Sequence, residues 1–187
     1  MFKRIAILSV VGAIGAALCF YAFVAWMDRG KNPSGKDWAG RTLLMLAAEK
    51  GDLRLAEALV EKGVDVSAMD NRGWTALTYA AGLGRSEVAK LLLDKGADVN
   101  AKSESGVTAL KNAVDSGHAD IVKLLLEGGA DVNTRLKDGS TVLMYATISG
   151  RNDIAKLLLE KGADLNAKTV DGSTALAWAC VMERAEL

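Results

Sequence analysis

The sequence predicts an all-α solenoid of stacked helix–turn–helix units with hairpin loops, preceded by a single transmembrane helix. A glycine recurs along the chain every 33 residues, and a threonine follows it two positions later each time. A fixed period of about 20–50 residues is typical of proteins that stack one small unit on copies of itself. A run of 22 uncharged residues near the amino terminus predicts the membrane helix. The recurring residues are Gly40, Gly73, Gly106, Gly139 and Gly172, with Thr42, Thr75, Thr108, Thr141 and Thr174.

The uncharged segment, Ile5–Trp26, is long enough to cross a membrane. As a helix rising about 1.5 Å per residue it would extend roughly 33 Å, compared with about 30 Å for a hydrocarbon core. Lys3 and Arg4 precede the segment, whereas its other flank is only weakly positive. The positive-inside tendency therefore predicts a single-pass anchor over residues 1–27, with the amino terminus in the cytoplasm and the repeats in a bacterial periplasm.

A cleaved signal peptide is the alternative for this segment, and it would leave the repeats periplasmic or secreted. The apolar region of a signal peptide normally has about 7–15 residues and ends at a small-x-small cleavage site. Cleavage after Ala22 or Ala25 would place a phenylalanine where that site needs a small residue, and Cys19 follows a leucine rather than the residue that a lipoprotein site prefers. The sequence therefore favours an uncleaved anchor.

A short linker separates the anchor from the repeats. Residues 28–36 are polar and contain two glycines and the only proline of the chain, Pro33, which predicts a flexible tether. Residues 37–187 form the predicted repeat domain. The period divides this domain into units at 37–69, 70–102, 103–135 and 136–168, with a partial fifth unit at 169–187.

Each unit has residues suited to a pair of stacked helices. The turn glycine is expected in a backbone conformation that a residue with a Cβ would resist, and the threonine is placed to cap the first helix. A second glycine, such as Gly84, is placed to end that helix. In the second helix Val88, Leu91 and Leu92 lie at i, i+3 and i+4, which predicts an apolar face that one unit cannot bury alone.

The unit resembles the ankyrin repeat over residues 37–187. The family places a proline and a histidine after the capping threonine, but this chain replaces both in every unit, as with Ala76 and Thr78 in the second. The resemblance implies that a hydrogen bond between neighbouring loops is lost with that histidine. The matching residues of the second unit are Gly73, Thr75, Leu77, Ala80, Ala81, Gly84, Val88, Leu91, Leu92, Leu93, Gly96, Ala97, Asp98, Val99, Asn100 and Ala101.

The fifth unit departs from the pattern after its first helix begins. Gly172, Thr174 and Leu176 match, but Glu183 stands where the glycine between the helices is expected. Two interpretations follow: residues 175–187 continue as one longer helix in an atypical terminal repeat, or the chain is truncated within the repeat.

The sequence provides no catalytic or metal-binding set of residues. Its 23 basic and 23 acidic residues balance, which argues against a nucleic-acid-binding surface. The only histidine, His118, is expected to cap a helix turn, and Cys180 to pack in the last helix, with a reactive thiol as the alternative. We predict no enzyme, no cofactor, no metal and no small-molecule substrate. The resemblance also implies turn hydrogen bonds for the recurring aspartates Asp65, Asp98, Asp131 and Asp164.

The resemblance implies a concave surface, made by the loop tips and the exposed side of the first helices, that contacts a protein partner. Tryptophan and arginine are enriched in interface hot spots. The alternative is that Trp74 covers a neighbouring loop and Leu83 a helix end. The predicted function is a non-catalytic protein-binding module or scaffold tethered to a membrane; an inhibitor of one secreted hydrolase is the alternative. The predicted partner-binding residues are Trp38, Arg41, Arg72, Trp74, Leu83, Val107 and Ile148, and the same surface holds Asn71, Glu104, Lys137 and Asp138.

Overall fold

The computed structural model describes residues 35–185. The predicted anchor over residues 1–27, and nearly all of the linker, lie outside the described residues. Within residues 35–185 no helix is both long enough and apolar enough to cross a membrane. The chain divides into two compact units, Met1–Asp37 and Trp38–Leu187, and the repeats lie in the second.

The repeats form short helices in pairs, as the period predicts. Each complete pair consists of a first helix that follows a loop and a second helix that follows a tight turn. Five first helices and four second helices lie in the described part of the chain. Their bounds are α2 Leu43–Lys50, α3 Leu53–Glu61, α4 Ala76–Gly82, α5 Ser86–Asp94, α6 Ala109–Ser116, α7 Ala119–Glu127, α8 Val142–Ile148, α9 Asn152–Glu160 and α10 Ala175–Ala185.

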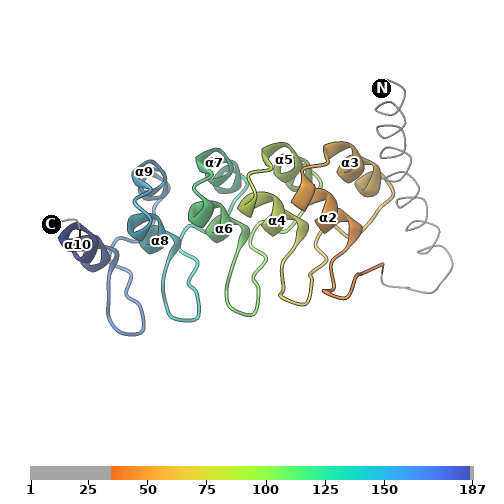
Figure 1. Ribbon diagram of the computed structural model, residues 1–187. Helices are drawn as coiled ribbons and strands as arrows, with labels where there is room; N and C mark the ends of the chain where they lie inside the picture. Colours follow the sequence, from red (N-terminus) through yellow and green to blue (C-terminus); the bar gives the residue numbers. More distant parts are fainter. Residues whose placement is uncertain (1–34, 186–187) are drawn as a thin grey trace, which may run out of the picture. The chain divides into compact units, whose positions relative to one another are not determined.

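The helices of the repeat unit form two rows (Figure 1). The first helices α2, α4, α6, α8 and α10 lie side by side in the row next to the loops, and the second helices α3, α5, α7 and α9 form the other row. Each helix packs against its equivalents in the neighbouring repeats and, within a pair, against its partner. The stacked helix–turn–helix arrangement predicted from the sequence is therefore confirmed.

Four of the five recurring threonines cap a first helix through their side chains. The hydroxyl of Thr75, for example, accepts a hydrogen bond of 3.2 Å from the backbone N–H of Thr78. Thr141 is the exception, because its Oγ1 is buried and makes no hydrogen bond within the described residues. The other capping threonines are Thr42, Thr108 and Thr174.

The turn glycines occupy the left-handed backbone conformation that the sequence predicts. Gly73 has φ +77°, and a Cβ built there would lie 2.9 Å from the Cα of Ser103 in the next loop. Both the conformation and the close approach of the loops therefore require glycine. The glycines that end the first helices, Gly51, Gly84, Gly117 and Gly150, also have positive φ.

The core lies between the two rows of helices, and its pattern differs in one respect from the prediction. Val88 and Leu92 of α5 are fully buried, together with Ala89, which the predicted stripe did not include. Leu91 is only half-buried, as are its counterparts Leu124 and Leu157. In α5 and α7 the residue at i+1 is therefore more buried than the residue at i+3.

Hairpin loops connect the repeats and project from the side of the first-helix row (Figure 1). In the second loop the N–H of Asp70 donates to the carbonyl of Trp74 over 2.9 Å, and the N–H of Gly73 donates to the carbonyl of Asp70. Within the described residues the loops contain one isolated bridge, Arg135–Thr141, and no strand.

The last described helix, α10, continues through Glu183 without interruption. The helix ends at Ala185, and residues 186–187 lie outside the described residues, so the choice between an atypical terminal repeat and a truncated one stays a prediction.

Candidate functional site

The second loop is built around the buried carboxylate of Asp70, whose side chain has no exposed surface. Its Oδ1 accepts hydrogen bonds from the backbone N–H groups of Arg72, over 2.8 Å, and Trp74, over 2.9 Å. Its Oδ2 accepts a third, of 2.8 Å, from the hydroxyl of Tyr79 on α4. Burial alone would raise the pKa of Asp70, but these donors and the nearby Arg72 charge lower it overall, so the carboxylate stays ionised.

Arg72 is held in place on the outer side of this carboxylate. Its guanidinium lies 4.2 Å from the centroid of the Trp74 ring, a cation–π stack. Its Nη2 donates a hydrogen bond of 2.6 Å to the hydroxyl of Tyr79, and its Nε lies 3.6 Å from Oδ2 of Asp70. The hydrogen bond to Tyr79 is the main reason that the pKa of Arg72 is raised.

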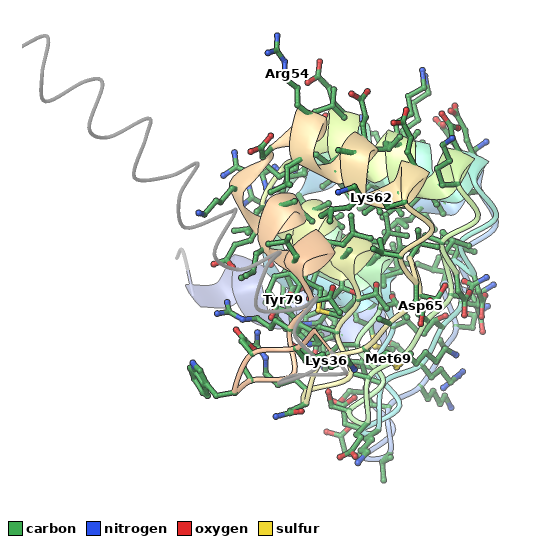
Figure 2. The ribbon with its side chains drawn as sticks, turned by 90° about the vertical axis from the view of Figure 1, so that its right-hand side faces the viewer. Lys36, Arg54, Lys62, Asp65, Met69 and Tyr79 are labelled. Atoms are coloured by element: carbon green, nitrogen blue, oxygen red, sulfur yellow. The ribbon has the colours of Figure 1, made fainter. Side chains whose placement is uncertain are left out.

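Tyr79 joins the loop to the first-helix row. Its ring is buried and meets the Trp74 ring edge-on, with 5.4 Å between centroids. Figure 2 shows Tyr79 inside the domain, whereas Arg54 of α3 points away from it. Burial and the hydrogen bond to Asp70 raise the pKa of the Tyr79 hydroxyl, so it remains a donor at neutral pH. We call Asp70, Arg72, Trp74 and Tyr79 the second-loop cluster.

Two hollows lie beside the second-loop cluster. The first hollow, of about 390 Å³, is lined by residues of the first two loops. The second hollow, of about 320 Å³, opens over α2, α4 and α6. The first hollow is lined by Trp38, Ala39, Arg41, Asn71 and Arg72. The second is lined by Glu49, Trp74, Thr78, Tyr79, Gly82, Leu83, Asn112, Asp115 and Ser116.

The structure brings five of the seven predicted partner-binding residues to these hollows. Trp38, Arg41 and Arg72 line the first hollow, and Trp74 and Leu83 line the second. Trp38 is 89% exposed and Leu83 is 44% exposed. The other two predicted residues, Val107 and Ile148, are half-buried and line neither hollow. Partner binding itself stays a prediction for all seven.

Sequence reasoning missed Glu49, Tyr79 and Asp115 as residues of this surface. They lie on the first helices, and their side chains reach the second hollow only because α2, α4 and α6 lie side by side. One signal could have indicated Tyr79: the positions that follow it at intervals of 33 residues hold Asn112 and Tyr145, rather than a small core residue.

Neighbouring loops are joined without the histidine that the ankyrin pattern provides. The N–H of Asn71 donates to the carbonyl of Ala39 over 3.0 Å, and its side chain to the carbonyl of Trp38 over 3.3 Å. Further along, the side chain of Asn100 both donates to the carbonyl of Gly129 and accepts from the N–H of Asp131. Asparagine side chains therefore tie the repeats together at several positions.

Two predictions about single residues need correction. His118 stands at the start of α7, but its side chain makes no capping hydrogen bond. Its ring instead lies over the turn of the preceding repeat, where a Cβ on Gly84 would come within 2.8 Å of it. Cys180 is exposed rather than packed.

No cluster of metal-ligating side chains occurs among residues 35–185. The recurring aspartates make the expected turn hydrogen bonds, and each accepts from the backbone N–H two residues later. The bonds are Ser67 to Asp65, Asn100 to Asp98, Asn133 to Asp131 and Asn166 to Asp164, all 2.9 Å.

Stacked helix pairs with projecting loops define a solenoid repeat protein whose exposed loop-and-helix surface can contact another protein. The family model for ankyrin repeats, in three copies, matches residues 15–103, 44–136 and 110–187. The chain belongs to the ankyrin-repeat family, whose members are generally non-catalytic modules for protein–protein interaction. A search of curated proteins found no match to the chain.

Proposed function

We propose that this chain is a non-catalytic protein-binding module, held at a membrane by Ile5–Trp26, with its repeats in a bacterial periplasm. A protein partner docks on the surface formed by the two hollows and the second-loop cluster, which we call the docking surface. The observation that supports this most directly is Trp38, a tryptophan with 89% of its surface exposed at the edge of a hollow. A large apolar side chain in that position is available to a partner.

The rest of the docking surface has the composition of an interface centre. Arg72 stacked on Trp74 is a pair of residue types that dominate hot spots, and Leu83 adds exposed apolar surface beside them. The pair is rigid because Tyr79 and Asp70 hold the guanidinium, so little conformational entropy is lost when a partner binds it.

Trp38→Ala tests the docking surface with little risk to folding, since the side chain is exposed. A partner is first identified by crosslinking and pull-down from membranes with the full-length chain. Loss of a hot-spot tryptophan costs at least about 2 kcal/mol, so we expect the dissociation constant for that partner to rise about 30-fold. The matched control is Val170→Ala, which removes an apolar side chain, 83% exposed, from the last loop, away from both hollows.

Equal affinity of Trp38→Ala and the unchanged protein would refute the docking surface, provided that helical circular dichroism is the same for both. A loss in Val170→Ala equal to that in Trp38→Ala would show that the last loop contributes as much and would also contradict the proposal.

The membrane tether is tested separately. We expect the full-length chain to stay with membranes after alkaline carbonate extraction and a version lacking residues 1–27 to be released. A carboxyl-terminal reporter that is active in only one compartment should report the periplasm. Release of the full-length chain by carbonate would contradict the anchor, and a cytoplasmic reporter signal would contradict the orientation.

A further inference from the structure

We propose that the docking surface binds an extended peptide segment of the partner that carries an acidic side chain and a basic side chain. The acidic side chain lies in the first hollow and the basic one in the second. This inference rests on the proposed function and adds the chemistry of the partner.

The charges of the docking surface are sorted between the two hollows. Two arginines, Arg41 and Arg72, and no carboxylate line the first hollow, whereas Glu49 and Asp115 and no basic residue line the second. Two contacts join the hollows. Arg72 of the first hollow stacks on Trp74 of the second, and Nη1 of Arg41 in the first lies 3.0 Å from Oε2 of Glu49 in the second. The charged side chains that line the two adjoining hollows are therefore basic in the first and acidic in the second.

Arg72 is suited to a carboxylate. Its side chain is 59% exposed, and a guanidinium has five N–H donors in a planar fork that matches a carboxylate in geometry. Within the described residues one hydrogen bond from this guanidinium is formed, to Tyr79. The stack on Trp74 and the bond to Tyr79 hold the remaining donors in one orientation before a ligand arrives.

The second hollow is suited to a lysine or arginine side chain. Glu49 is 42% exposed and Asp115 is 36% exposed; each contacts one base, Arg41 and Lys111 respectively. An ionised carboxylate has about four acceptor positions, so each can accept a further donor. Leu83 in the same wall is 44% exposed and offers apolar surface to the stem of such a side chain.

An extended segment fits this arrangement better than a single protruding side chain. Arg72 lines the first hollow and Trp74, on which it stacks, lines the second, so the two hollows adjoin. Alternate side chains of an extended segment point to the same side and can therefore enter adjoining hollows. The opposite charges also give the segment one favoured direction, because reversing it would place like charges together.

The test uses a phage-displayed library of short random peptides selected on the immobilised full-length chain. We expect enriched peptides to contain an acidic and a basic residue at a constant spacing. For purified peptides, measured by fluorescence anisotropy, Arg72→Gln should weaken binding about tenfold, and replacing the acidic residue of the peptide should then cause no further loss. Glu49→Gln should likewise weaken binding, and replacing the basic residue of the peptide should then cause no further loss.

Lys123→Gln is the matched control, because Lys123 is an exposed charged residue of α7 outside both hollows. Urea unfolding of every variant shows whether it is folded. Peptides that depend on Trp38 but have no charge preference would overturn this inference and leave the proposed function intact. Peptides that bind Trp38→Ala as tightly as the unchanged protein would contradict both. Failure to enrich any peptide would overturn the inference alone.

Discussion

Replacing Tyr79 by phenylalanine should destabilise the repeats, because it removes one oxygen that two charged groups share. The hydroxyl donates to Oδ2 of Asp70 over 2.8 Å and accepts from Nη2 of Arg72 over 2.6 Å. Asp70 has no exposed side-chain surface, so water cannot replace the lost donor there. Arg72 is 59% exposed, so water can replace the acceptor that it loses.

The expected cost follows from that difference. A hydrogen bond to a charged group contributes about 1.5–3 kcal/mol, and only the bond to the buried carboxylate counts fully. We therefore expect the free energy of unfolding to fall by about 1.5–3 kcal/mol. In urea, where the slope for a small protein is about 1–3 kcal/mol per molar, the midpoint should fall by about 1 M with the slope unchanged.

The same substitution at Tyr145 is the control. Tyr145 occupies the equivalent position in the fourth repeat, with Lys111 Nζ 4.5 Å from its ring centroid and the Trp178 ring at 6.4 Å, but its hydroxyl makes no hydrogen bond within the described residues. We expect Tyr145→Phe to change stability by less than about 0.5 kcal/mol. Equal shifts in the two variants would refute the conclusion that the Tyr79 hydroxyl stabilises the buried carboxylate.

Two further predictions concern the turns and acid. Gly117→Ala should lower the free energy of unfolding by at least about 1–2 kcal/mol, since φ is +76° and the new Cβ would lie 2.6 Å from Cζ of Arg151. The control is Gly128→Ala, which should leave stability unchanged or slightly higher because φ there is −77°. Equal midpoints of the two variants in urea unfolding would contradict this prediction. The pKa of Asp70 is lowered in the folded state, so its contribution to stability is present above the unfolded pKa of about 3.9 and is lost as pH falls through the folded value. Asp70→Asn should therefore be less stable than the unchanged protein at pH 7, but it should lose less stability than the unchanged protein as the pH falls below about 4. Parallel pH profiles of the urea midpoint for the two proteins would contradict this prediction.

The local features of the fold could be predicted because each depends on a single residue and its position. A glycine is needed wherever the chain must take positive φ, so Gly73 and its counterparts indicate every loop. A threonine before an apolar run indicates a cap, and this prediction is confirmed except at Thr141, whose side chain makes no capping hydrogen bond. The half-buried position of Leu91 was not predictable, since periodicity identifies a face but not its direction towards the next repeat.

The candidate site was predictable only in part. Trp38 and Arg72 lie on the loops, where residue type and position are enough to suggest exposure, whereas Trp74 is half-buried against the core. Asp115, in contrast, lies 41 residues after Trp74 in the sequence and joins it in one hollow only through the stacking of α4 on α6.

The sequence by itself determined that this protein is a stack of ankyrin repeats, because a 33-residue period repeats the same local conformational requirements in every unit. It also determined which residues stand on the loops. Only the tertiary structure decided that Tyr79 holds Arg72 against Trp74 above a buried carboxylate, and that opposite charges line two adjoining hollows. Those contacts join different elements, and their energies depend on distances and burial that exist only after the repeats have packed.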